Sequence, residues 1–237
     1  MHIYKCRRFL LRSRGVNAVV IILSGLFAAV IFQPNGINAS ASDAKAAVSS
    51  VAGRAFAIQR NDEDIGRHEM RFERLDGRLN VRIKVSVDYR LLFIPVYRFR
   101  HEAHEIWDGG VLKALRATTD DNGDAYDVAV QGNGAALTLS VNGEETDIQH
   151  DAVLTSLWRE DMARAGQMID PADGEVMEVQ VSGGDGEEIS VRGETIRARH
   201  YIMTGGLDRE LWYDSEGLLV KVRFTGEDGS VVQFRML

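Results

Sequence analysis

At 237 residues, the chain is long enough for one domain with a full hydrophobic core or for two small domains. Residues 1–41 hold five basic and no acidic side chains, so the remainder carries 23 Lys and Arg against 35 Asp and Glu, a formal charge of −12. An acidic body argues against a nucleic-acid partner, whose phosphates require a basic surface. It also disfavours electrostatic docking on anionic lipid.

The N-terminus has the three parts of an export signal. Residues 1–14 are basic, residues 15–32 form an uncharged apolar run, and a small-residue site ends at Ala41. We therefore predict a signal peptide over residues 1–41, cleaved near Ala41, and a periplasmic or secreted body. The alternative is an uncleaved inner-membrane anchor, because the run lies at the short end of the ~17–25 residues that span a bilayer. The single cysteine, Cys6, lies in the basic segment, so the body has no disulfide.

The body divides into a flexible lead-in and one β domain. Residues 42–54 are rich in alanine and serine, which is typical of a mobile segment, and residues 55–237 form the domain. Apolar and polar side chains alternate over residues 79–89, which predicts a strand with one dry and one wet face in an antiparallel sheet. Asp-Gly at residues 76–77 and Asn-Gly at residues 122–123 are typical of two-residue hairpin turns.

The same reasoning predicts further strands at residues 56–60, 65–75, 97–107, 111–117, 126–130, 137–141, 144–148, 176–181, 188–191 and 195–203. The segment 151–165 differs, because its apolar residues recur at helical spacing and Asp151 suits an N-cap. We therefore predict one amphipathic α-helix there. Residues 207–237 predict three strands joined by two tight turns that end at Gly217 and Gly229, where glycine supplies a positive φ.

These elements define the expected fold class. About a dozen antiparallel strands without βαβ alternation must curve or close to hide their edges. We predict a mainly β protein, a strongly curved antiparallel sheet in the form of a half-barrel or incomplete barrel. The helix is expected against its concave side, with Trp158 packed into the hollow.

The sequence H-E-A-H-E at residues 101–105 is the strongest candidate for chemistry. Two histidines and two carboxylates would suit zinc on a helix, but strand alternation points His101 and His104 to opposite faces. We therefore predict no metal site. We expect cross-strand ion pairs along the wet face of this strand, which carries Arg98, Arg100, Glu102 and His104.

The dry face of this strand lines the predicted hollow. His101 and Glu105 are either a satisfied buried pair or groups that contact a ligand, and general acid–base chemistry would require such a pair. No catalytic motif or cofactor-binding motif accompanies them. The candidate hollow residues are Tyr97, Phe99, His101, Glu105, Trp107, Trp158 and Trp212.

An apolar run interrupts the alternation at residues 91–96. It is either a buried corner of the core or an exposed lip that meets a membrane, a partner or an acyl chain. Arg90 and Arg98 flank it, which would suit an interfacial insertion. The candidate lip residues are Leu91, Leu92, Phe93, Ile94 and Val96.

Several motifs carry a family resemblance. They are G-R-H-E-M-R-F from Gly66, H-E-A-H-E-I-W-D-G-G at 101–110, T-D-D-N-G-D at 119–124, L-T-S-L-W at 154–158 and L-W-Y-D-S-E-G-L-L-V-K at 211–221. From about Phe56 onward the chain resembles a family of uncharacterised secreted bacterial proteins known only as a domain of unknown function. The W-Y-D-x-x-G-L-L-V hairpin is its most specific motif, and the group is similar in outline to the periplasmic lipoprotein-carrier half-barrel. The resemblance implies a fold and a compartment, and it implies no reaction.

Three functions remain open from the sequence. The first is a non-catalytic binding or carrier module for an apolar, acyl or lipid-like ligand held in the hollow. The second is a structural or interaction protein of the cell envelope with a filled core. The third is a hydrolase that uses His101 and Glu105. In each case we expect no cofactor, no nucleic acid, and membrane contact only through the N-terminal segment or the lip.

Overall fold

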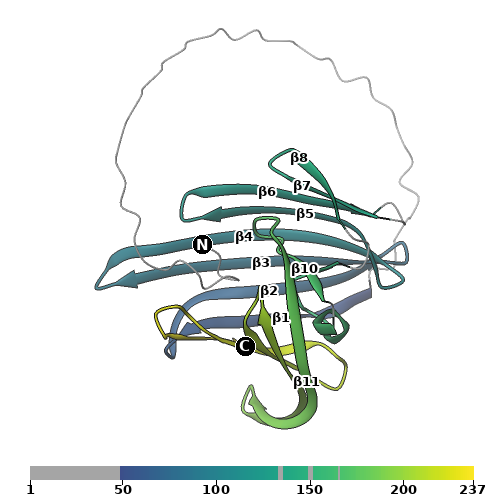
Figure 1. Ribbon diagram of the computed structural model, residues 1–237. Helices are drawn as coiled ribbons and strands as arrows, with labels where there is room; N and C mark the ends of the chain where they lie inside the picture. Colours follow the sequence, from purple (N-terminus) through teal and green to yellow (C-terminus); the bar gives the residue numbers. More distant parts are fainter. Residues whose placement is uncertain (1–48, 133–135, 149–151, 165) are drawn as a thin grey trace, which may run out of the picture.

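The computed structural model describes residues 49–132, 136–148, 152–164 and 166–237, and in them one large sheet accounts for nearly all regular structure (Figure 1). The only helix among these residues is a 3-10 helix, Glu160–Arg164. In chain order the strands are β1 (Ser49–Arg60), β2 (Glu63–Leu75), β3 (Arg78–Leu91), β4 (Ile94–Asp108), β5 (Val111–Asp121), β6 (Asp124–Gly132), β7 (Leu137–Val141), β8 (Glu144–Ile148), β9 (Val153–Leu154), β10 (Gln167–Ile169), β11 (Val176–Val191), β12 (Glu194–Gly205), β13 (Arg209–Tyr213), β14 (Leu219–Thr225) and β15 (Val231–Met236).

The sheet is open and almost entirely antiparallel. Its strand order is β8-β7-β6-β5-β4-β3-β2-β1-β15-β14-β13-β12-β11-β10-β9, and only β9 and β10 pair in parallel. Strands β1 to β8 and β9 to β15 therefore each lie in sequence order; β8 and β9 are the two edges of the sheet, and β1 pairs with β15 through Phe56 opposite Met236. The mainly β, antiparallel prediction is confirmed, although the sheet has 15 strands.

Side-chain alternation decides which face of the sheet is buried. In β3, Val81, Ile83, Val85 and Val87 are buried, and the residues between them are exposed or half-buried. β4 continues the pattern from Tyr97 to Trp107. Apolar side chains of this inner face form one continuous core. In the order of the sheet, it runs from β7 through β1 and β15 to β11.

The predicted α-helix over residues 151–165 is wrong. The described part of this stretch contains β9 and the 3-10 helix; residues 152–164 and 166–172, which we call the interior segment, lie against the inner face of the sheet. Its backbone bonds join residues far apart in the sequence: Thr155 N–H donates to Ile169 C=O within the segment, and Trp158 C=O accepts from Leu219 N–H on β14. These long-range partners replace the i to i−4 bonds of an α-helix.

The C-terminal prediction is confirmed by β13, β14 and β15, and Gly217 and Gly229 adopt φ values of 75° and 78°. Two strands predicted at 176–181 and 188–191 form one long strand, β11. Gly183 and Gly184, both at positive φ, lie where its pairing with β12 shifts register, so the chain bends there without ending the strand.

The predicted signal peptide, residues 1–41, lies outside the described residues. Strand β1 begins at Ser49, within the predicted lead-in. Within the described ranges, no helix is long and apolar enough to cross a membrane.

Candidate functional site

Trp158 anchors the interior segment to the sheet. Its ring centroid lies 5.3 Å from that of Phe72 on β2 and 5.9 Å from that of Trp107 on β4. The indole N–H groups of Trp107 and Trp158 both donate to Oε2 of Glu105, at 2.8 and 2.9 Å. Three of the residues predicted to line the hollow, Glu105, Trp107 and Trp158, therefore meet there, whereas Tyr97, Phe99 and His101 stack on one another farther along β4.

Glu105 is fully buried at the centre of this contact. Burial raises the pKa of its carboxyl group, while the two indole donors and the nearby guanidinium of Arg159 act to lower it. That guanidinium carbon lies 4.6 Å from the ring centroid of Trp107 and 5.1 Å from that of Trp158. The carboxyl group thus joins the interior segment to β4 and is shielded from solvent.

His101 and Glu105 do not form a pair. Nδ1 of His101 lies 2.9 Å from Oγ1 of Thr119, and the ring stacks beside Phe99. Burial lowers the pKa of His101 to about 4. On the same inner face, burial lowers the pKa of His68 to about 3, with smaller effects from His101 and Arg209. Both histidines are therefore neutral at neutral pH, and each is enclosed by the core.

Trp212 does not join the other predicted hollow residues. Its ring stacks on His200 at 4.4 Å, the ammonium of Lys221 lies 4.3 Å from the ring centroid, and its N–H donates to Glu187 at 3.3 Å. These polar partners place it apart from the Trp107–Trp158 cluster. Leu211 and Tyr213, its neighbours along β13, are also buried.

The wet face of β4 carries the predicted ion pairs. Arg98 pairs with Asp120 on β5 at 2.6 Å, and Arg100 pairs with Asp88 on β3 at 2.7 Å. Glu102 pairs with Lys84, whereas His104 hydrogen-bonds to Asn80 instead of forming an ion pair. His101 and His104 lie on opposite faces, and the described residues contain no group of three metal-ligating side chains.

The apolar run at residues 91–96 is the exposed tip of the β3–β4 hairpin. The exposed fractions are 58% for Leu91, 83% for Leu92, 93% for Phe93, 67% for Ile94 and 41% for Val96. The sequence allowed either a buried corner or an exposed lip here, and in the structure the run is exposed. β5 pairs with β4 only as far as Phe99, and β2 pairs with β3 only as far as Val87, so the hairpin projects past both neighbours (Figure 1).

The turn at this tip has an unusual sequence for its geometry. Leu92 and Phe93 adopt φ values of 47° and 73°, a conformation that strains residues with a side chain. Other two-residue turns with the same geometry use residues that tolerate it, such as Asn122-Gly123 and Asn142-Gly143. The exposed apolar pair is therefore retained despite a conformational cost.

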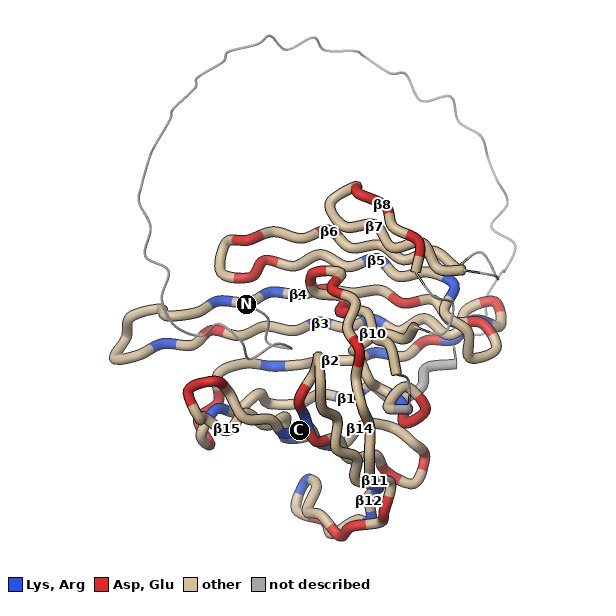
Figure 2. Tube along the Cα trace, in the orientation of Figure 1, with Lys and Arg blue, Asp and Glu red and all other residues tan. Residues whose placement is uncertain are grey.

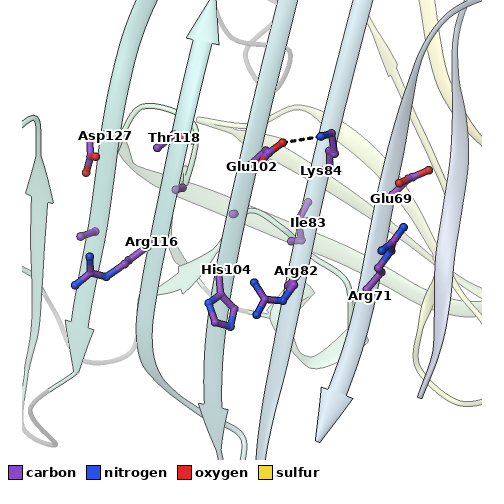
Figure 3. Close-up of a pocket in the computed structure, with 13 residues that line it drawn as sticks. Glu69, Arg71, Arg82, Ile83, Lys84, Glu102, His104, Arg116, Thr118 and Asp127 are labelled. Atoms are coloured by element: carbon purple, nitrogen blue, oxygen red, sulfur yellow. Dashed lines mark hydrogen bonds and ion pairs between the residues drawn. The ribbon is translucent and has the colours of Figure 1, made fainter. Parts of the chain in front are cut away.

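A groove of about 730 Å³ lies on the wet face of β2 to β6, away from the apolar tip (Figure 3). Arg71, Arg82, His104 and Arg116 form one row across it, one residue from each of four adjacent strands. Sequence analysis did not identify this row. The sequence does contain the signal for one part of the row, because a two-residue turn at Asp76-Gly77 places Arg71 opposite Arg82.

These features define a class of protein: a mainly β domain built on one large, open, largely antiparallel sheet, with a filled interior and an exposed apolar hairpin. The model of a domain of unknown function, DUF6134, matches residues 56–237, and the chain belongs to this family. A search of curated proteins found no match.

A solved structure shares the fold. It is the crystal structure of a beta-barrel-like protein of the domain of unknown function DUF1849 from Brucella abortus. The TM-score is 0.59 at 8% sequence identity, and the similarity covers 78% of this chain and 94% of that chain. At this identity the likeness describes the fold alone.

Proposed function

We propose that this chain is a non-catalytic interaction module of the bacterial cell envelope, and that it docks on a protein partner through the β3–β4 tip. The observation that carries the proposal is the exposure of five adjacent apolar side chains, Leu91, Leu92, Phe93, Ile94 and Val96, on a projecting hairpin. Contiguous exposed apolar residues of this kind mark interaction sites. Export to the envelope rests on the predicted signal peptide.

The filled interior favours an interaction module over an enzyme. Glu105, His101 and His68 are buried, with exposed fractions of 0–2%, and Glu105 and His101 contact core partners. General acid–base catalysis requires a group that reaches its substrate, directly or through one water. None of the three side chains reaches the surface in this conformation.

The charges around the tip favour a protein partner over an anionic bilayer. The neighbouring hairpin ends carry acidic side chains: Asp62, Glu63 and Asp64 where β1 turns into β2, and Asp124 where β5 turns into β6 (Figure 2). Beside the tip, Arg98 and Arg100 are paired with acidic residues, which leaves Arg90 as the exposed basic side chain next to it. Acidic turns repel anionic headgroups, whereas they complement a partner whose apolar socket has a basic rim.

The experiment is site-specific photocrosslinking in cells that make the full chain. A photoreactive residue at Ile94 is combined with either the native turn or the Leu92→Asn, Phe93→Gly turn, which keeps the hairpin geometry and removes the apolar tip. Ile202→Thr is the matched control, because Ile202 is an exposed apolar residue on β12. We expect one protein adduct that persists in the control and is lost with the Asn-Gly turn.

Calorimetry with the purified partner completes the test. Binding should show a negative heat-capacity change, since apolar surface is buried, and the Asn-Gly turn should abolish it. Crosslinks to lipid or to a second copy of the chain would overturn the proposal, as would an adduct that survives loss of the apolar tip.

One observation favours a second candidate, a carrier of an amphiphilic ligand. A cavity of about 740 Å³ lies beside the β11–β12 turn, with Val220 and Met236 among its apolar lining. Its charged lining is Arg54, Arg192, Arg197, Glu194 and Asp214, and Arg54 is paired with Asp214 at 2.6 Å, so Arg192 and Arg197 are the arginines available to a ligand. This volume is in the range of small-molecule sites, and the lining suits an apolar chain with an anionic head. Native mass spectrometry of the exported protein, purified without detergent, tests it. A ligand adduct that is lost with Arg192→Gln would support a carrier, and a bare mass would exclude it.

A further inference from the structure

The row of basic residues in the groove of Figure 3 is set by strand register. Arg71 lies opposite Arg82, Arg82 opposite His104, and His104 opposite Arg116. Adjacent strands are about 4.8 Å apart, so the row extends for about 14 Å across β2 to β5. Four basic residues in direct cross-strand register repel one another when charged, and such pairs destabilise a sheet.

The neighbouring row on the same face mixes acidic and basic side chains. It contains Glu69, Lys84, Glu102, Thr118 and Asp127, and Lys84 Nζ lies 2.6 Å from Glu102 Oε1 (Figure 3). Farther along the strands, Arg98 and Arg100 are also paired with acids. Ion pairs therefore account for Lys84, Glu102, Arg98 and Arg100 on this face, but not for the arginines of the basic row.

The arginines of the row are available to a ligand. Arg71, Arg82 and Arg116 are exposed, and within the described ranges none of them forms an ion pair or side-chain hydrogen bond with an acidic residue. His104 is half-buried and oriented by Asn80, whose Oδ1 lies 2.9 Å from Nε2. Ile83 lines the groove between these polar residues, and the volume of about 730 Å³ suits a small ligand.

The spacing of the row indicates the ligand. Guanidinium groups bind phosphate and carboxylate through paired N–H donors. An extended acidic peptide presents carboxylates on one face only about every 6.7 Å, which is wider than the strand spacing of about 4.8 Å. A phosphoryl chain carries anionic oxygens on every unit, so each arginine can meet one. The acids of the neighbouring row confine such a chain to the line of the arginines.

We propose that this groove binds a soluble linear polyphosphate chain, lying across β2 to β5 on Arg71, Arg82 and Arg116 with His104 as an additional polar contact. The body carries a formal charge of −12, which excludes long nucleic acids while permitting a short, densely charged ligand in one local basic groove. This site is separate from the apolar tip and does not depend on the function proposed for it.

The test is titration calorimetry of the full chain with tripolyphosphate at physiological salt. We expect saturable binding that weakens at least tenfold in Arg82→Gln and in Arg116→Gln. Arg98→Gln is the matched control, because it removes one positive charge from the same face outside the row, and we expect less than a twofold change. Thermal unfolding of each variant verifies that the fold is intact, and the exposed positions allow this comparison.

Binding measurements with three other ligands identify the class of ligand. Orthophosphate should bind far more weakly than tripolyphosphate, because it spans only one arginine, and oligoglutamate should also bind weakly. Vesicles containing phosphatidylglycerol should not compete. Absence of saturable tripolyphosphate binding, equal loss in Arg98→Gln, equally tight binding of oligoglutamate, or binding to vesicles alone would each overturn the proposal.

Discussion

Replacing Trp158 tests whether the interior of the sheet is a core or a site that can open. The side chain is 4% exposed and packs on Phe72 and Trp107. Truncating a buried tryptophan to alanine costs about 3–5 kcal/mol of stability through lost packing and the cavity left behind. Its hydrogen bond to Glu105 involves an ionisable acceptor, for which losses of about 1.5–3 kcal/mol are typical. We expect Trp158→Ala to lower the free energy of unfolding by about 5 kcal/mol, a large share of the 5–15 kcal/mol of an ordinary domain.

Urea unfolding of the full chain, followed by circular dichroism, measures this loss. Trp158→Phe is the matched variant, because it keeps an aromatic ring against Phe72 and removes the N–H donor with only part of the indole volume; we expect it to cost about 2 kcal/mol. A loss below about 1 kcal/mol in Trp158→Ala would refute the reasoning, since a buried side chain cannot be removed from a cooperative core so cheaply. The interior segment would then be a detachable cover, and the carrier function would gain support.

Two further predictions concern the tip and the buried histidines. Changing Leu92-Phe93 to Asn-Gly should raise the free energy of unfolding by about 1 kcal/mol by relieving left-handed backbone strain; a lower melting temperature than wild type would contradict this. His68 binds a proton more weakly in the folded chain, where its pKa is about 3, than in the unfolded chain, where it is 6.5. Its contribution to stability is therefore complete above pH 6.5 and is lost as the pH falls toward 3, by up to about 1.4 kcal/mol per pH unit. In urea titrations between pH 7 and pH 4.5, the free energy of unfolding should fall less steeply with falling pH in His68→Leu than in the wild type. Part of the pH dependence should remain in the variant, because His101 also has a lowered pKa. Equal pH dependence in the variant and the wild type would exclude this account.

Local rules predicted much of the sheet because turns and alternation are local signals. The Asp76-Gly77 dipeptide places the β2–β3 turn, and alternation in β3 gives its buried face. The same rule gave no face for β13, where Leu211, Trp212 and Tyr213 are consecutive and all buried. Alternation therefore does not determine which face of β13 carries Trp212.

Long-range contacts set the features that local rules missed. The helical spacing in residues 151–165 describes a stretch buried among strands, whose backbone partners include Ile169, Gly217 and Leu219. The exposure of the tip depends on how far β2 and β5 extend beside β3 and β4. The basic row beyond Arg82 depends on a register shift after Tyr89, which no local pattern indicates.

The pairing of β1 with β15 determines the order in which the sheet can be completed. A chain that emerges N-terminus first can form β1 to β8 as successive hairpins, but the edge of β1 stays unpaired until the last residues arrive. Leu237 N–H donates to Ala55 C=O, so the C-terminal end of β15 lies beside the middle of β1. A circular permutant opened between β8 and β9, with a linker from the end of β15 to the start of β1, would have every strand beside its neighbour in sequence. Such a permutant should fold faster than the natural chain, because its one pairing between opposite ends becomes local.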